Sequence, residues 1–286
     1  MKNLGVDIIY IINRLQDYDR KESIISKLEF IENLNYEIIQ AVTGESLPPV
    51  EKMLKDKTIF KVFTDPIGRL TKNIYATAMS HQKVYSRFLH SEYKTCLILE
   101  DDIEFTENFH TDFKSGDFKK FIKEANNTEY DILYWGRTKT SGEIEYTKQV
   151  TSKLYNVKKN TSYYGAHAYQ INKQGAKKLI EKGRPIKYAA DVLLESIDVL
   201  VLAPKHSYLI QEYSIADNTQ RFISASSTQE DLFKKYDSKV KSNYVRNVKE
   251  CKVYRDIPVE KITFLPRKLE NGAIVENWAS IYLNRD

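Results

Sequence analysis

Three consecutive acidic residues, Glu100, Asp101 and Asp102, have the types and spacing that most clearly indicate chemistry in this sequence. They directly follow the apolar residues 97–99, although like charges this close repel one another, and more strongly where water is excluded. An extended chain would place Glu100 and Asp102 on one side and Asp101 on the other. Paired carboxylates suit a hard divalent cation such as Mn²⁺ or Mg²⁺. The alternative is a solvated acidic turn.

The elements that must position these acids are predicted from runs of apolar residues. Continuous β-branched and aromatic runs predict buried strands, at residues 8–12, 36–42, 97–99, 132–135, 166–171 and 199–202. Helical spacing of apolar residues predicts helices between them, at residues 24–34, 74–88 and 172–183. Strands that alternate with helices predict an α/β fold with a mostly parallel sheet, and ligands bind such a sheet at the carboxyl ends of its strands.

The domain organisation follows from where this pattern weakens. The pattern predicts one α/β domain over residues 1–221, flanked by helices. The charged, less periodic residues 222–286 are predicted to form a small helical C-terminal extension packed on the same domain. A chain of 286 residues is long enough for that arrangement.

Composition excludes several classes of protein. The net charge of +5 is spread along the sequence, so no nucleic-acid partner is expected, although a nucleotide diphosphate would suit it. The two cysteines show no disulfide or zinc spacing. No apolar run reaches the roughly 18 residues of a membrane span, and no signal peptide is seen at the N-terminus, so a cytoplasmic location is expected. The oligomeric state is not indicated.

Several segments, taken in chain order over residues 6–220, resemble glycosyltransferase family 25, which includes bacterial lipopolysaccharide sugar transferases and procollagen galactosyltransferases. The order and similar gaps make the resemblance specific. The matching residues are Ile11–Asn13 with Asp19 and Arg20; Leu70 and Thr71 with Ser80 and His81; residues 97–102; residues 130–137; residues 165–169 with 175–179; Asp191 with Leu193; and Pro204 with His206, Gln211 and Asp217.

Three places in the sequence affect what the resemblance can predict. Residues 74–77 replace the family's usual Glu-Ile-Gly-Cys, and Val192 stands where an acid usually follows the position of Asp191. These two departures bear on the acceptor and on the identity of the base. The Gly136-Arg137 pair favours the collagen-modifying branch.

The resemblance implies a GT-A type, Rossmann-like fold and a metal-dependent hexosyltransferase. The donor would be a UDP-hexose, with galactose or glucose as the sugar, and Mn²⁺ or Mg²⁺ as the cofactor. The reaction would invert the anomeric carbon. The acceptor hydroxyl would belong to a glycan or to hydroxylysine of a collagen-like chain.

The resemblance also assigns roles to individual residues. The metal ligands would be Asp102, Glu100 and His206, and Asp191 would be the base, with Asp217 as second choice. The donor-binding set would be Asn13, Arg20, Gly44, Ser80, His81, Glu100, Asp101, Gly136, Arg137 and His167.

Structural roles compete at several of these positions. Asp191 precedes an apolar run and suits a helix cap. His81 lies on the apolar stripe of its helix, as a core histidine would. Arg20 has Asp17 and Asp19 as possible surface partners, a pairing that contributes little. His206 lies in a short polar segment, where a surface histidine is as common.

Two other functions compete with the transferase. A nucleotidyltransferase on a similar sheet would need a glycine-rich phosphate loop near the first strand, and residues 13–20 contain no glycine. A non-catalytic domain that binds a glycan or a protein partner on a GT-A scaffold would have lost the reaction. The intact acidic triplet argues against that domain.

Overall fold

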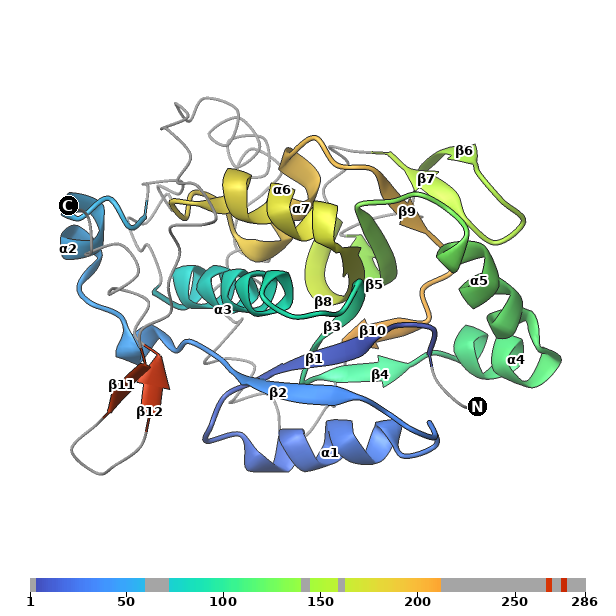
Figure 1. The fold of residues 1–286 in the computed structure, drawn as a ribbon, viewed down its shortest axis with the longest axis horizontal. Coiled ribbons are helices and arrows are strands. Elements are labelled where there is room, and N and C mark those ends of the chain that lie inside the picture. Colours follow the sequence, from blue (N-terminus) through green and yellow to red (C-terminus); the bar gives the residue numbers. More distant parts are fainter. Residues whose placement is uncertain are drawn as a thin grey trace.

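The six predicted strands join two further strands in one eight-stranded sheet in the computed structural model (Figure 1). The model describes residues 4–59, 72–139, 145–158 and 163–211, together with the backbone of 266–268 and 274–276. The order across the sheet is β2, β1, β3, β8, β5, β9, β7, β6. The bounds are β1 (Ile8–Asn13), β2 (Tyr36–Gln40), β3 (Thr95–Glu100), β5 (Ile132–Lys139), β6 (Tyr146–Gln149), β7 (Tyr155–Val157), β8 (Tyr163–Asn172) and β9 (Val201–Ala203).

Most strands of this sheet share one direction, as predicted. β1 pairs in parallel with both β2 and β3, and β5 pairs in parallel with β9. β8 is antiparallel to both of its neighbours, β3 and β5, in the middle of the sheet. β7 is also reversed, between β9 and β6. The mostly parallel α/β prediction is confirmed, with one reversed strand at the centre.

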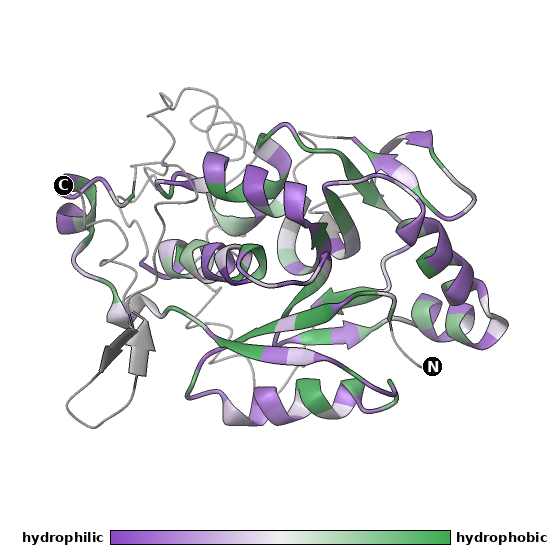
Figure 2. Cartoon of the chain, in the orientation of Figure 1, coloured by the Kyte–Doolittle hydropathy of each residue, from purple (hydrophilic) through white to green (hydrophobic). Residues whose placement is uncertain are grey.

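Helices cover both faces because both faces of the central strands are apolar. Along β1, Ile8, Tyr10 and Ile12 belong to one core cluster, and Ile9 and Ile11 belong to the other. The first cluster packs against α3 (Lys72–Leu89), α6 (Lys173–Gly183) and α7 (Ala190–Ser196). The second packs against α1 (Tyr18–Leu28), α4 (Glu107–Ser115) and α5 (Asp117–Asn126). Figure 2 shows apolar strands between helices whose outer sides are polar.

Smaller elements complete the described chain. The 3₁₀ helix η1 (Gly44–Ser46) and α2 (Val50–Lys55) follow β2. β4 (Ile103–Phe105) pairs antiparallel with β10 (Leu209–Gln211), directly after the acidic triplet.

The helical C-terminal extension over residues 222–286 stays a prediction. Within that segment the structure describes two short antiparallel strands, β11 (Pro266–Lys268) and β12 (Ile274–Glu276). The other residues of that segment lie outside the described part of the chain, as do Leu70, Thr71 and Asp217.

The buried side chains of β3 predict a clear stability experiment. Leu97 is fully buried between the sheet and its helices, whereas Leu200 is 43% exposed. We expect Leu97→Ala to lower the free energy of unfolding by about 2–5 kcal/mol, because the cavity left in the core cannot close fully. Leu200→Ala makes the same change at an exposed position and is expected to cost much less. Urea unfolding of both variants measures the difference, and equal losses would contradict this description of the core.

Candidate active site

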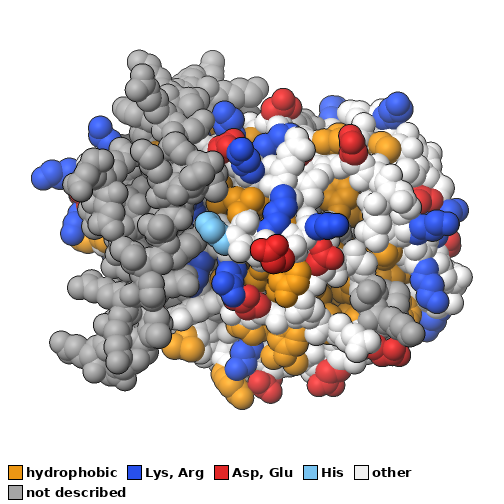
Figure 3. Space-filling view, in the orientation of Figure 1, with side chains coloured by type: hydrophobic (Ala, Val, Ile, Leu, Met, Phe, Trp, Pro, Cys, Tyr) orange, Lys and Arg blue, Asp and Glu red, His pale blue; other side chains and the backbone are white. Residues whose placement is uncertain are grey.

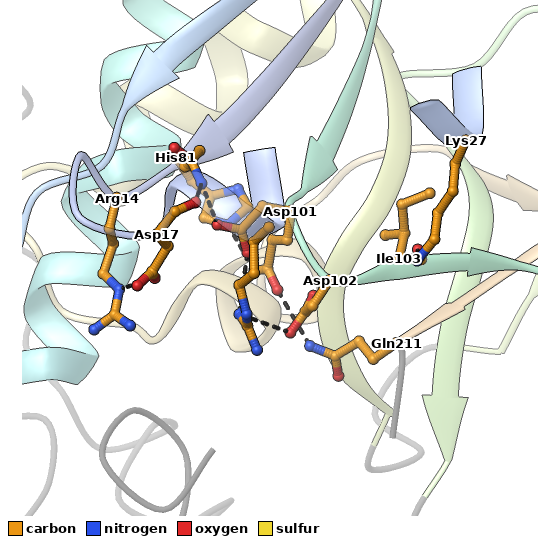
Figure 4. A network of polar contacts seen from close by, with 11 residues as sticks. Arg14, Asp17, Lys27, His81, Asp101, Asp102, Ile103 and Gln211 are labelled. Carbon is orange, nitrogen blue, oxygen red and sulfur yellow. Dashed lines mark hydrogen bonds and ion pairs between the residues drawn. The ribbon is translucent and has the colours of Figure 1, made fainter. Parts of the chain in front are cut away.

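The acidic triplet lies where β3 ends, beside the end of β1. The register pairs Ile12 with Glu100, so Asn13 is the next residue at the same edge. Arg20 reaches this edge from the first turns of α1. Figure 4 shows Asp101, Asp102, His81 and Gln211 converging there. The predicted placement of the acids at the carboxyl edge of a buried strand is confirmed.

Asp101 and Asp102 share one cation, the Arg20 guanidinium. Arg20 Nη1 lies 3.1 Å from Asp101 Oδ1 and 3.7 Å from Asp102 Oδ2. Asn13 Nδ2 donates to Asp101 Oδ2 at 2.7 Å. β3 ends at Glu100 and Asp101–Asp102 form a turn before β4, so the extended chain that would place Glu100 and Asp102 on one side does not continue past Glu100. The turn instead directs Asp101 and Asp102 toward α1.

Glu100 faces α3 and is held at both carboxylate oxygens. His81 Nε2 lies 3.2 Å from Oε1, and Gln211 Nε2 donates to Oε2 at 3.2 Å. His81 Nδ1 in turn lies 2.7 Å from the Tyr169 hydroxyl. His81 is therefore a core histidine, 1% exposed, that also contacts the acidic site.

Burial and mutual repulsion set the protonation of the three acids. Burial, with the nearby charges of Glu100 and Asp101, raises the pKa of Asp102 to about 7. Burial also raises the pKa of Asp101, although Arg20 and the Asn13 amide oppose the shift. Burial works in the same direction at Glu100, but the hydrogen bond from His81 and the positive charge of Arg20 oppose it, and the pKa of Glu100 is lowered. The site accumulates negative charge that a cation would relieve.

This arrangement predicts how stability depends on pH. A carboxyl whose pKa is raised on folding contributes stability that is present below its unfolded pKa and lost as pH rises through its folded pKa. For Asp102 the window runs from the ordinary aspartate pKa of 3.8 to about 7. We expect the metal-free protein to lose unfolding free energy over this range relative to Asp102→Asn, which carries no titrating group there. Urea titrations at several pH values test this, and parallel curves would contradict it.

His167 lies in a tight cradle between two glycines. A Cβ atom added at Gly136 would lie 2.8 Å from His167 Nε2 and 2.0 Å from the Leu209 carbonyl oxygen. At Gly165, where φ is +91°, it would lie 2.5 Å from His167 Nδ1. His167 is fully buried, and neither ring nitrogen has a hydrogen-bond partner within the described part of the chain. Burial lowers its pKa, so the ring is held neutral.

Asp191 approaches the same region from α7. It lies in the first turn of this helix, whose N-cap is Ala189, so the capping alternative for Asp191 is wrong. Its oxygens accept from the backbone N–H groups of Val192 at 2.8 Å and Gly165 at 3.4 Å. Burial raises the pKa of Asp191, and the charge of Glu100 adds to that shift. Asp191 and the triplet therefore belong to one electrostatic environment.

The other predicted residues lie around this centre with structural contacts. The Ser80 hydroxyl accepts from the Val42 N–H, which ties α3 to the segment after β2. Gly44 packs so closely on α3 that an added Cβ would lie 2.2 Å from Asn73 Oδ1. Arg137 is buried with its guanidinium 5.3 Å from the Tyr134 ring centroid. His206 lies on an exposed turn, and no described contact joins it to the acids.

Two tyrosines near the site were not predicted as functional residues. Tyr169 contacts His81, and the Tyr85 hydroxyl lies 2.6 Å from that of Tyr169. Tyr85 and His81 share the apolar stripe of α3, and Tyr169 lies two residues after His167 on β8. This placement beside His81 and His167 was the only indication in the sequence that the two tyrosines contact the site. A tyrosine in an apolar pattern is equally typical of a core residue. Gln211 belonged to the matching segments but received no role.

The described residues could hold a divalent cation only if a bound ligand, such as a substrate phosphate, supplied further oxygen atoms to it. Among the described residues, no group of three or more His, Cys, Asp or Glu side chains could hold a metal ion. Asp102 Oδ1 is nevertheless buried without a hydrogen-bond partner in that part of the chain. Mg²⁺ is commonly bound by one or two carboxylates together with substrate phosphates. Asp102, with Asp101 beside it, fits that kind of site.

The described face shown in Figure 3 carries both kinds of charged side chain. Figure 3 shows basic and acidic side chains interspersed on the visible described face, so no basic stripe suited to nucleic acid lies there. None of the helices in the described residues is both long and apolar enough to pass through a bilayer.

Comparison with known families agrees with the sequence resemblance. The model of glycosyltransferase family 25 (LPS biosynthesis protein) matches residues 6–194. Procollagen galactosyltransferase 2 of Homo sapiens is 23% identical over 184 residues, a match that covers 62% of this chain and 28% of that protein. Inactive glycosyltransferase 25 family member 3 of Homo sapiens is 26% identical, covering 62% and 29%. The chain thus spans less than a third of the length of these relatives.

Solved structures are only distantly similar. The inositol-1-phosphate CTP transferase of T. maritima has a TM-score of 0.37 and 13% identity, with 87% of this chain and 80% of that chain covered. That similarity is too low to transfer any feature of its site to this chain.

Proposed function

This chain belongs to glycosyltransferase family 25, and from that premise we propose that it transfers a hexose from a UDP-sugar to an acceptor hydroxyl with inversion at the anomeric carbon. The observation that most supports this proposal is the convergence of three acids at the carboxyl end of β3, with Asp102 Oδ1 buried and unpartnered within the described residues. A diphosphate-bound cation would satisfy that oxygen and the negative charge around it.

The metal site would be built from Asp102 and Asp101, with the fixed charge of Glu100 nearby. A bound Mn²⁺ or Mg²⁺ supplies Lewis-acid stabilisation of the negative charge that develops on the departing diphosphate. Arg20, which now pairs with Asp101 and Asp102, offers a second positive group at the same edge. His206, predicted as a further ligand, has no described contact that supports the role.

Asp191 is the proposed general base. A base must accept the proton of the acceptor hydroxyl as that oxygen attacks the sugar on the face opposite the leaving group. Two backbone N–H groups orient the Asp191 carboxylate, and burial raises its pKa, which makes it a stronger base than an exposed aspartate. Asp217, the second choice, lies outside the described residues.

The donor and acceptor are proposals of the same kind. The donor sugar is galactose or glucose, and the acceptor is a glycan or hydroxylysine of a collagen-like chain. Procollagen galactosyltransferase 2 carries the collagen activity in its name, and here that name only guides the choice of substrates to test.

A non-catalytic binding domain is the competing proposal, because one relative is named inactive. Incubation of the protein with a panel of UDP-hexoses, Mn²⁺ and candidate acceptors, followed by measurement of released UDP, separates the two. The transferase proposal expects release that depends on both the metal and the acceptor. UDP binding without release from any donor would favour the binding domain.

A further inference from the structure

A chain of buried hydroxyl and imidazole groups runs from the interior of the protein to the acidic site. The Tyr85 hydroxyl lies 2.6 Å from that of Tyr169, which lies 2.7 Å from His81 Nδ1. His81 Nε2 lies 3.2 Å from Glu100 Oε1. Tyr85 and Tyr169 are fully buried and His81 is 1% exposed, so water does not compete for these bonds.

The donors and acceptors of this chain can be counted. Burial raises the pKa of both phenols, so each keeps its proton, and each O–H needs an acceptor. The Tyr85 hydroxyl has no partner other than Tyr169 within the described residues. Tyr85 must therefore donate to the Tyr169 oxygen, which leaves the Tyr169 O–H to donate to His81 Nδ1. His81 then carries its hydrogen on Nε2 and donates it to Glu100.

The two alternative states of His81 fail the same count. With the hydrogen on Nδ1 instead, a lone pair on Nε2 would face the Glu100 carboxylate. A charged imidazolium would donate from both nitrogens, reverse the two hydroxyls, and leave the Tyr85 hydrogen without an acceptor in the described part of the chain. Each alternative leaves a buried polar group unsatisfied, which is unfavourable.

We propose that Tyr85, Tyr169 and His81 form a positioning relay that fixes the Nε2–H tautomer of His81 and thereby the orientation of Glu100. Gln211 holds the second oxygen of Glu100, so the carboxylate is clamped from two sides. The relay keeps the Glu100 charge beside Asp102 rather than free to rotate toward Arg20. The contribution of the relay to cation binding rests on the proposed function. The Nε2–H tautomer of His81 does not depend on that function.

The tautomer is tested by NMR on the full chain labelled with ¹⁵N-histidine, with His81→Gln used to assign the His81 signals. We expect long-range ¹H–¹⁵N correlations to show an unprotonated Nδ1 and a protonated Nε2. In Tyr169→Phe the ¹⁵N chemical shift of His81 Nδ1 is expected to move toward the value of an imidazole nitrogen that accepts no hydrogen bond. A protonated Nδ1 in the parent protein, or an unchanged Nδ1 signal in Tyr169→Phe, would overturn the relay.

The consequence for cation binding is tested by titration with Mn²⁺ in the presence of saturating UDP, followed by electron paramagnetic resonance. Tyr169→Phe is expected to weaken Mn²⁺ affinity about tenfold, as loss of outer-shell support to a metal site commonly does. Tyr85→Phe is expected to act in the same direction. The matched control is Tyr130→Phe, which removes another buried hydroxyl that contacts Gln170, away from the acids. Equal Mn²⁺ affinities in Tyr169→Phe and Tyr130→Phe would remove the positioning role.

The two experiments separate failure of the relay from failure of the proposed function. A parent protein that binds no Mn²⁺ in the presence of UDP but shows the Nε2–H tautomer would refute the metal-dependent transferase and leave the relay standing. A parent protein that binds Mn²⁺ but shows a protonated Nδ1 would refute the relay alone.

Discussion

Asp102→Asn is expected to abolish metal-dependent UDP binding while the fold remains intact. The substitution replaces a carboxylate by a neutral amide, and so removes the negative charge from a side chain whose Oδ1 is buried without a partner in the described residues and would face a cation. Outer-shell changes alone typically cost about 10–100-fold in metal affinity, so loss of a direct ligand is expected to cost at least about 100-fold. Calorimetric titration of UDP with and without Mn²⁺ measures the effect.

The fold of this variant should survive because the change relieves repulsion among the acids. Asp112→Asn is the matched control: Asp112 is an acid of α4 that accepts from the Tyr208 hydroxyl. That variant should retain metal-dependent UDP binding. If Asp102→Asn binds UDP as the parent does, with the same dependence on Mn²⁺, Asp102 is not a ligand.

Asp191→Asn is expected to retain donor binding and to lose transfer by about 10²–10⁴-fold, the usual contribution of a general base. The asparagine side chain has nearly the same shape but cannot take the proton of the acceptor hydroxyl. Asp198→Asn makes the same change at an exposed position beyond α7 and should leave the rate unchanged. Initial rates of UDP release at saturating donor, together with UDP affinity, measure both expectations.

The pH dependence gives a further test of Asp191. Because burial raises its pKa, the basic form appears at a higher pH than for an ordinary aspartate. The rate of the parent protein should therefore fall on the acid side at a correspondingly higher pH. Near-normal turnover in Asp191→Asn would move the role to another acid, with Asp217 the first to examine.

Much of this fold followed from simple patterns. Continuous apolar runs predicted the central strands because strands covered on both faces are apolar throughout. The helix predicted over residues 172–183 is confirmed as α6, and the Asn172 side chain caps it by accepting from the Gly175 N–H at 2.7 Å. The position of Glu100–Asp102 at a strand end followed from the abrupt change from apolar to acidic residues.

Other features depend on contacts between distant segments and leave no local pattern. The reversal of β8 is fixed by its pairing with β3 and β5, and its apolar sequence would suit either direction. The turn at Asp101 and Asp102 depends on Arg20 of α1. The relay from Tyr85 through Tyr169 joins two elements more than 80 residues apart in sequence. Both tyrosines lie in apolar sequence patterns, which do not indicate that their hydroxyl groups form a hydrogen bond with each other.

The reversed direction of β8 has a consequence for how relatives of this chain can diversify. Because β5 and β8 run antiparallel, the end of β5 at Lys139 pairs with the start of β8 at Tyr163. The intervening stretch, which includes β6 and β7, therefore departs from and returns to the same rim of the sheet. Additions or deletions there would reshape that rim while leaving the strand register and the acids of β3 untouched. Selection for a new acceptor would then have a segment to vary without changing the acids of β3.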